Sequence, residues 1–345
     1  MAIESNHFRS YSTHPSGNVH ATNMQAPDGD DDRSDTDSEI TEVGEEEIPL
    51  YFTERDGRLF HSHGSSPYPL PVDTAEQDRI NGQHEILRHF LLGIYVDRNA
   101  VREVLRGSPT RQRRALDLAT GTGKWVLDLA AEFTHVKVYG LDIVPIATRH
   151  PPHNVFFEMQ DINQTLRFHD GDIDLVHARS VSMAVRCYPD LVKEVARVLR
   201  PGGLFLACEW GRYPAMSEEV DVVTRLPCSC RFFNAVIDTL HRSHGITPVA
   251  QNLCRYISDS GRFDQIYSHR FAIPIGDWHE NPVYQRLGLQ YRSILELYAD
   301  SMGVMMVQAG KSEAEVNELV RSYVDELYTV SGLVSHYYVV QARRV

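Results

Sequence analysis

The chain has 345 residues, a formal net charge of −13 and an apolar fraction of 42%. Its longest apolar runs, such as residues 86–96 and 204–208, are too short or too interrupted by charge to cross the roughly 30 Å of a bilayer. The first thirty residues lack an apolar core preceded by positive charge, so we expect synthesis in the cytosol. The five cysteines form neither an even set nor a zinc-like spacing, so we expect reduced thiols and no metal site.

An acidic, polar segment opens the chain. Residues 1–50 carry twelve carboxylates and two arginines, so most of the formal net charge lies there and the remainder is nearly neutral. Residues 1–48 lack spaced apolar side chains and cannot bury enough surface to offset the entropy cost of ordering, so we expect a disordered tail. The nearly neutral remainder predicts no broad phosphate-binding surface, and therefore no direct nucleic-acid binding.

Residues 49–110 are expected to form an N-terminal helical cap. Asp73 is followed three residues later by Glu76, which is a variant of the capping box that begins a helix. Apolar side chains then recur at helical spacing. The pattern predicts a helix over residues 74–92 that packs one face against a larger body.

Short apolar runs then alternate with helical patterns, as in a parallel sheet that is covered on both faces. A helical pattern over residues 191–199, closed by a turn at 200–203, separates the last two runs. The alternation predicts a Rossmann-like, doubly wound α/β fold. Its five parallel strands are expected at residues 115–118, 136–141, 155–159, 173–177 and 204–208.

Longer helical patterns follow the fifth run. Two strand-like stretches, residues 267–275 and 335–343, interrupt and end this region. They predict a terminal antiparallel hairpin that completes a seven-stranded, mostly parallel sheet. We expect residues 111–345 to form one domain with helical lid insertions at about 213–262 and 280–330, and the helical patterns lie at residues 228–243, 249–259, 283–307 and 312–328.

The glycine-containing loop after the first run is the central motif. Residues 115–124 read Ala-Leu-Asp-Leu-Ala-Thr-Gly-Thr-Gly-Lys, in which Gly121 and Gly123 let the backbone turn sharply or approach a ligand. A dinucleotide fingerprint would need glycine at positions 119 and 124. A phosphate-binding Walker loop would need a serine or threonine where Trp125 follows the lysine. The sequence excludes both motifs.

The loop resembles the first motif of class I methyltransferases, acidic-x-G-x-G-x-G. Asp117, Ala119, Gly121 and Gly123 occupy the motif positions. The resemblance implies S-adenosylmethionine as cofactor, with Asp117 near the ammonium of its methionine part and the glycines beneath it. Ala119 replaces the first glycine, and its methyl group is tolerated there if the local φ is negative.

Further acids follow the next two strands. Asp142, with Ile143 beside it, ends the second strand about 20 residues beyond the glycines, where a carboxylate can accept both ribose hydroxyls of a nucleoside. Asp161 ends the third strand, and the resemblance implies that it accepts the adenine amino group while the amide of Ile162 meets the ring edge. Ligands of open α/β sheets bind at these strand ends, so the three acids together predict one cofactor site.

Three other polar residues follow the last two parallel strands. Arg179 follows the fourth strand, Glu209 and Trp210 follow the fifth, and all should face the same crevice. Arg179 lines either the cofactor side or the substrate side of that crevice, or forms a surface ion pair. Methyl transfer from a sulfonium is a direct displacement for which a general base is optional, and we assign no catalytic residue.

Four segments give a more particular resemblance. Residues 68–79 begin Tyr-Pro-Leu-Pro-Val-Asp, residues 199–203 read Leu-Arg-Pro-Gly-Gly, residues 273–278 read Ile-Pro-Ile-Gly-Asp-Trp, and residues 336–340 read His-Tyr-Tyr-Val-Val. With the glycine loop they resemble the LaeA-type methyltransferases of fungi over about residues 50–345. The resemblance implies helical lids over the cofactor, and Tyr68 either reaches over the cofactor or packs against its neighbours.

The resemblance leaves the function open between two classes. One is a methyltransferase that acts on a small molecule or a protein, with a link to fungal secondary metabolism. The other is a LaeA-like regulatory subunit that works through a protein partner. A third class, a nicotinamide-dependent oxidoreductase, would also use Asp142, but this sequence lacks the glycines that it requires.

We expect a cytoplasmic protein, a nuclear protein or both. The basic residues 111–114 are typical either of a nuclear address or of a solvated helix end.

Overall fold

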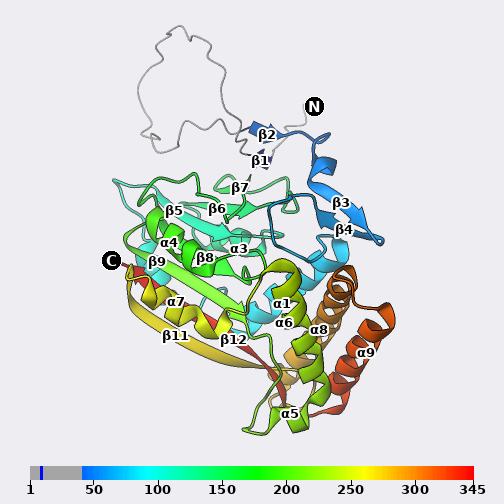
Figure 1. The fold of residues 1–345 in the computed structure, drawn as a ribbon. Coiled ribbons are helices and arrows are strands. Elements are labelled where there is room, and N and C mark those ends of the chain that lie inside the picture. Colours follow the sequence, from blue (N-terminus) through cyan, green and yellow to red (C-terminus); the bar gives the residue numbers. More distant parts are fainter. Residues whose placement is uncertain (1–7, 11–40) are drawn as a thin grey trace.

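The computed structural model describes residues 8–10 and 41–345, and its centre is a twisted, mostly parallel sheet (Figure 1). The five parallel strands lie in the spatial order β9, β8, β5, β6, β7. Each of the five predicted runs is a strand, so the predicted α/β fold is confirmed. The strands are β5 (Arg113–Leu118), β6 (Val136–Asp142), β7 (Val155–Met159), β8 (Ile173–Arg179) and β9 (Leu199–Trp210).

A terminal antiparallel hairpin extends the sheet beyond β9, as predicted. Its strands are β11 (Phe263–Pro274) and β12 (Leu333–Arg344), and β12 pairs with both β11 and β9. With these two strands the five parallel strands make the expected seven, and three short strands extend the described sheet to ten. The chain leaves β5 toward β6 and β7 on one side and returns to β8 and β9 on the other, so the topology switches beside β5. Ligands of such sheets bind at the carboxyl ends of the strands at this switch.

Helices cover the sheet and extend beyond one end of it (Figure 1). Helix α1 (Thr74–Phe90) begins at Asp73, whose side chain accepts a hydrogen bond from the amide of Glu76, as the capping pattern predicts. Helix α1 packs against α8, which belongs to the insertion in the hairpin. The other helices are α2 (Arg98–Val104), α3 (Lys124–Glu132), α4 (Tyr188–Val198), α5 (Val222–Arg225), α6 (Pro227–His244), α7 (Leu253–Asp259), α8 (Pro282–Gln308) and α9 (Glu313–Thr329).

The region predicted as a helical cap also contains a β-hairpin. Strands β3 (Phe52–Arg55) and β4 (Arg58–His61) pair across Asp56 and Gly57, which adopt φ of 51° and 70°. Two positive φ values in succession are the geometry of a type I′ turn, and Asp-Gly is a preferred sequence for it. The Asp-Gly pair was the signal that the helical interpretation of this segment overlooked.

Two further segments differ from the expectations. Residues 200–203 form no turn between helix and strand, because β9 already begins at Leu199 and accommodates Gly202 at a φ of 73°. Short strands also lie within the segment expected to be disordered. Strand β1 (Phe8–Ser10) pairs with β7 and with β2 (Thr41–Val43), whereas most of the predicted tail lies outside the described residues.

Three minor features complete the described fold. A 3₁₀-helix spans Ile48–Tyr51, a second spans Ala250–Asn252, and the two-residue strand β10 (Ala215–Met216) pairs with β12. Among the described helices, none combines the length and the apolar character that crossing a membrane requires.

The basic residues 111–114 are engaged in contacts with the amino end of β8. The fully buried carboxylate of Asp174 accepts from Arg113 at 2.8 Å, from Arg200 at 2.7 Å and from the amide of Arg114 at 2.9 Å. Arg111 donates to two backbone carbonyls nearby. These contacts hold the cluster against the amino end of β8.

We expect Asp174→Ala to lower the free energy of unfolding by about 3 kcal/mol, because the change leaves partly buried guanidinium groups and one buried amide without their acceptor. Chemical denaturation followed by circular dichroism measures the difference. Asp170→Ala is the matched control, since this carboxylate is 83% exposed and should contribute less than about 0.5 kcal/mol. Equal effects of the two substitutions would contradict the assignment.

Candidate functional site

One cavity opens at the carboxyl ends of the parallel strands. It runs from the ends of β5, β6 and β7 past β8 and β9 to helices α1, α6 and α8. Nine residues were predicted to contact a cofactor, and the structure brings eight of them to this one cavity. They are Asp117, Ala119, Gly121, Asp142, Ile143, Asp161, Ile162 and Arg179.

The ninth predicted residue, Gly123, has a different role. It adopts a φ of 76° at the N-terminus of α3 and is buried away from the cavity. A Cβ at this position would lie 2.4 Å from the ring of Phe157 on β7. The glycine is therefore needed for the turn into the helix and for close packing, and its predicted cofactor contact is corrected. Gly121, by contrast, lines the cavity at a φ of 58°.

Ala119 departs from the backbone conformation expected of it. Its φ is 51°, in the left-handed region, whereas the sequence argument required a negative value. An L-residue with a Cβ is strained in this region by roughly 1–2 kcal/mol. The neighbouring strand explains this conformation. After β5 the chain turns toward β6, and the amide of Thr120 donates to the carbonyl of Leu141.

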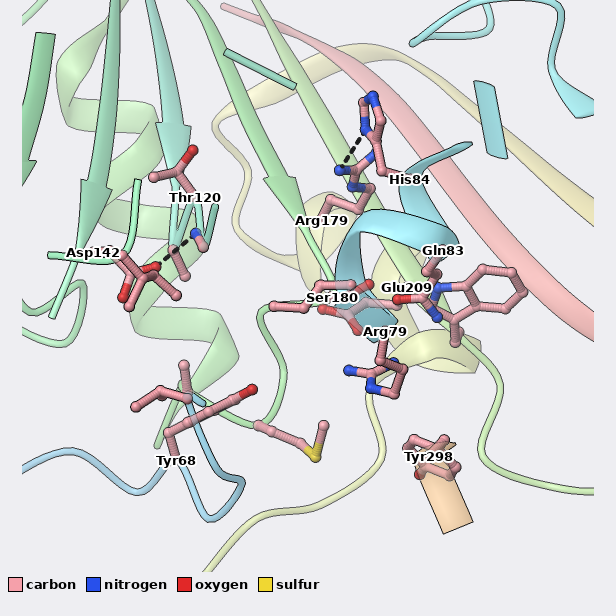
Figure 2. A pocket seen from close by; sticks show the side chains of 18 of the residues that line it. Tyr68, Arg79, Gln83, His84, Thr120, Asp142, Arg179, Ser180, Glu209 and Tyr298 are labelled. Atoms are coloured by element: carbon pink, nitrogen blue, oxygen red, sulfur yellow. Dashed lines mark hydrogen bonds between the residues drawn. The ribbon is translucent and has the colours of Figure 1, made fainter. Parts of the chain in front are cut away.

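Asp142 is held in place by backbone amides. Its Oδ2 accepts from the amide of Gly121 at 2.7 Å, and its Oδ1 accepts from the amides of Ile143 at 2.8 Å and Val144 at 3.3 Å (Figure 2). Burial raises the pKa of this carboxyl to about 6 despite the three amides that favour its ionised form. Oδ2 retains a lone pair for a further donor, whereas Oδ1 already accepts from two amides. The carboxylate is thus held in a fixed orientation at the cavity.

Asp117 is buried between two neutral donors. The Thr120 hydroxyl donates to Oδ2 and the Nδ1–H of His177 donates to Oδ1, each at 2.7 Å. His177 stacks on Trp125 with 3.9 Å between ring centroids, and burial lowers the pKa of its imidazole. A neutral imidazole stabilises the carboxylate without cancelling its charge. The contacts give His177 a positioning role for Asp117.

Asp161 lies at the end of β7 and is also held by uncharged groups. Its Oδ1 accepts from the backbone amide of Asn163 at 2.9 Å and from the side-chain amide of the same residue at 2.7 Å. Its Oδ2 accepts from the hydroxyl of Ser65 at 3.3 Å. Ser65 belongs to the segment between β4 and α1, so this segment reaches the site beside the third acid.

Arg179 points into the cavity from the end of β8 and pairs with a histidine. Its Nη2 donates to Nδ1 of His84 at 3.1 Å (Figure 2), and Nε2 of His84 donates to Asp128 at 2.9 Å. Burial lowers the pKa of His84, so the imidazole is neutral and its tautomer is fixed by the two partners. Of the alternatives for Arg179, the surface ion pair is therefore wrong. The guanidinium keeps its charge for a ligand in the cavity.

The far end of the cavity, here called the distal half, is lined by Arg79, Glu209, Arg212, Tyr291 and Tyr298. Figure 2 shows Tyr298 at the opposite end of the cavity from Asp142, with Glu209 and Arg79 between them. Arg79 is neutralised by Glu76 on the same helix at 2.6 Å, and Glu76 also accepts from Ser301 of α8. The Glu76–Ser301 hydrogen bond thus connects α1 and α8 beside the distal half.

Glu209 is part of a buried chain of hydrogen bonds. Its carboxylate accepts from the amide and the hydroxyl of Ser182, each at 2.9 Å, and the hydroxyl of Ser182 accepts from Arg212 at 2.9 Å. Burial raises the pKa of Glu209 to about 7. The predicted location of Glu209 and Trp210 at the crevice is confirmed, because both line the cavity.

Sequence reasoning missed several residues of the site. His84, Gln83 and Arg79 line the cavity from α1, and Tyr298 lines it from α8. The helical spacing of Glu76, Arg79 and Gln83 places them along one face, and that polar stripe on an otherwise amphipathic helix was the available signal. Tyr298 carried no such signal, since its place depends on how the insertion folds back on α1. Tyr68 also lines the cavity, as the resemblance suggested.

We expect Ala119→Gly to raise the free energy of unfolding by about 1 kcal/mol, because glycine adopts a positive φ without the Cβ clash. The fold should stay intact, and adenosyl ligands should bind as well as before or more tightly. Denaturation curves and isothermal titration calorimetry measure the two quantities. Ala130→Gly is the control. It should lower the free energy of unfolding by about 1 kcal/mol, because Ala130 is buried in helix α3 and glycine is unfavourable inside a helix. Loss of binding in Ala119→Gly would contradict the geometry.

Comparison with known proteins bears on the family. A model of a methyltransferase domain matches residues 115–203, which span β5 to the glycines of β9. A protein of Coprinopsis cinerea named secondary metabolism regulator laeA is 29% identical over 285 residues, covering 79% of this chain and 68% of that protein. Methyltransferase pytC of Aspergillus terreus is 27% identical over 262 residues, covering 74% of each chain.

A solved structure matches the chain at low similarity. It is phosphoethanolamine N-methyltransferase 2 of Haemonchus contortus in complex with S-adenosyl-L-methionine, with 13% identity and a TM-score of 0.44, and the match covers 87% of this chain and 72% of that one. The domain match and the fungal relatives agree with the glycine loop and the three strand-end acids. The chain thus matches a methyltransferase domain over residues 115–203 and is similar to fungal proteins named laeA and pytC.

Proposed function

We propose that the chain is an S-adenosylmethionine-dependent methyltransferase that acts on a small-molecule acceptor. The observation that carries the proposal is the convergence of three acids, from the ends of three adjacent strands, on one cavity beside the glycine loop. The cofactor supplies an electrophilic methyl group on a sulfonium, and the protein's part is to bind, orient and exclude water.

The donors and acceptors of the cavity fit each part of that cofactor. Asp142, with both oxygens oriented by amides, suits the ribose hydroxyls. Asp161 and the amide of Ile162 suit the adenine edge. Asp117 is negative and Arg179 is positive, and they come from neighbouring strands, which suits the ammonium and the carboxylate of a methionine part. The charges of the protein thus mirror those of an adenosyl amino acid.

The helices supply the enclosure that methyl transfer needs. Residues of α1, α6 and α8 line the cavity opposite the strand ends, and the hydroxyl of Thr122 in the glycine loop donates to Asn81 of α1 at 2.6 Å. This contact holds α1 over the loop. A covered cavity keeps water from the reacting atoms. Its enclosure also favours a small acceptor over a side chain on a folded protein.

The names of the relatives suggest the biological setting. Several are called secondary metabolism regulators and two are called methyltransferases, so the proposal includes a link to fungal secondary metabolism. The competing function is a regulatory subunit that works through a partner. Cytoplasmic location, nuclear location or both are part of the same proposal, which a fluorescent fusion expressed in a fungal host tests.

We expect Asp142→Asn to weaken binding of S-adenosylhomocysteine at least tenfold, because the amide replaces one charged acceptor of the ribose hydroxyls by a donor. Isothermal titration calorimetry at pH 7.5 measures the change. Asp170→Asn, an exposed carboxylate outside the cavity lining, should bind as the unmodified chain does. Unchanged affinity in Asp142→Asn would contradict the assignment of the ribose site.

The affinity should also depend on pH in a direction set by Asp142. The ribose hydroxyls donate to the ionised carboxylate, and burial raises the pKa of that carboxyl to about 6. Below pH 6 the protein must first lose a proton to bind, so affinity should fall about tenfold for each pH unit. Titrations between pH 5 and 8 measure this slope. The slope should vanish in Asp142→Asn, and its persistence would show that another group titrates.

A methyltransferase, a regulatory subunit and a nicotinamide-dependent oxidoreductase should give different results in a thermal-shift assay and a methyl-transfer assay. We expect S-adenosylhomocysteine to raise the unfolding temperature and NAD to leave it unchanged, because only a ligand that binds the folded state stabilises it. Tritium from labelled S-adenosylmethionine should enter acceptors in a fungal cell extract. Stabilisation without any transfer would favour the regulatory subunit, and stabilisation by NAD alone would exclude the methyltransferase.

A further inference from the structure

The distal half contains a buried positive charge without a directly paired acid. Arg212 is 8% exposed, lines the cavity and donates to the hydroxyl of Ser182. Within the described part of the chain, no carboxylate lies at salt-bridge distance from it. Glu209 is close enough to feel its charge, but the oxygens of Glu209 bind Ser182. A buried cation without a counter-charge is costly unless a ligand supplies one.

The other arginine of the distal half shows the contrast. Arg79 is equally buried, and its guanidinium contacts both oxygens of Glu76 at 2.6–3.0 Å. Its charge is therefore compensated within the protein. Arg212 has no such direct ion pair, because the oxygens of Glu209 bind Ser182, so most of its N–H groups stay available to an acidic ligand.

Two more donors lie in residues that line the same region. The indole N–H of Trp210 is buried and has no hydrogen-bond partner within the described residues, and the buried hydroxyl of Tyr298 lies within reach of Arg212. The charge of Arg212 also acts on Tyr298. A guanidinium and an indole N–H can only donate, and a tyrosine hydroxyl can donate. These groups together call for an acceptor oxygen, which an oxyanion provides.

Apolar side chains form the rest of the distal half. Met183, Phe233, Leu295 and Tyr291 line the cavity and are each less than 10% exposed. They come from the loop after β8 and from helices α6 and α8. Such walls suit an apolar body and would leave the hydroxyls of a sugar without partners.

We propose that the distal half binds a small apolar molecule that carries one oxyanion, a carboxylate or an ionised phenol or enol, with the oxyanion held by Arg212. The proposal deepens the proposed function, because it names the class of methyl acceptor. The strand order supports the placement: cofactor groups lie over β5, β6 and β7, and the distal half lies beyond β8 at β9 and β12. The bound molecule would thus lie beside the methionine part of the cofactor.

Matched pairs of acids and neutral amides test the proposal. Benzoate, 2-naphthoate and hexanoate are titrated by calorimetry into the full chain, each against benzamide, 2-naphthamide or hexanamide, with and without S-adenosylhomocysteine. We expect at least one acid to bind ten times or more tightly than its amide. Arg212→Met should abolish that preference, Arg212→Lys should keep part of it, and Arg88→Met, which changes an exposed arginine, should leave it unchanged.

The readouts separate this inference from the proposed function. Affinity for S-adenosylhomocysteine should stay within twofold in Arg212→Met, which also shows that the variant folds. A large loss of that affinity would assign Arg212 to the cofactor and overturn the inference, as would equal binding of every acid and its amide. If S-adenosylhomocysteine fails to bind the unmodified chain while an acid still binds through Arg212, the proposed function fails and the anion site stands.

Discussion

The burial of three carboxylates at the ends of adjacent strands is the constraint on which the cavity depends. A charge removed from water is costly unless donors replace its hydration. Each acid here receives uncharged donors: backbone amides for Asp142, a hydroxyl and a neutral imidazole for Asp117, and amides and a hydroxyl for Asp161. Such donors stabilise the charge without cancelling it. The cavity therefore stays negative where a cationic sulfonium and ammonium would lie.

Two arginines that line the cavity also have uncharged hydrogen-bond partners. Arg179 is held by neutral His84, and the counter-charge at Asp128 lies on the far side of the imidazole. Arg212 is held by a serine hydroxyl. By contrast, Arg79 and Asp174 lie in direct ion pairs and serve the fold. The protein thus uses neutral partners where a ligand must compete for a charge, and charged partners where the contact only stabilises the structure.

The sequence predicted the sheet and the location of the strand-end acids well, because both depend on local patterns. Strand burial shows as short apolar runs, and the carboxyl ends of parallel strands must share one edge, so Asp117, Asp142 and Asp161 could be placed together in advance. The backbone conformation of Ala119 could not be predicted in the same way, since its positive φ depends on where β6 lies. Gly123 was misread because a glycine that packs and a glycine that meets a ligand look alike in sequence. The Asp56-Gly57 pair is a sequence signal for a hairpin turn, and the helical prediction for this segment overlooked it.

The distal half could not be derived from local patterns at all. Glu76 and Ser301 are 225 positions apart, and they meet only because the hairpin insertion folds α8 back onto α1. That meeting brings Tyr298 and Arg79 to the same cavity as Arg212. Buried charges and unpaired donors in this region lower the stability of the ligand-free protein, and only a bound ligand offsets that cost. The geometry of the distal half therefore favours a protein that binds a ligand there.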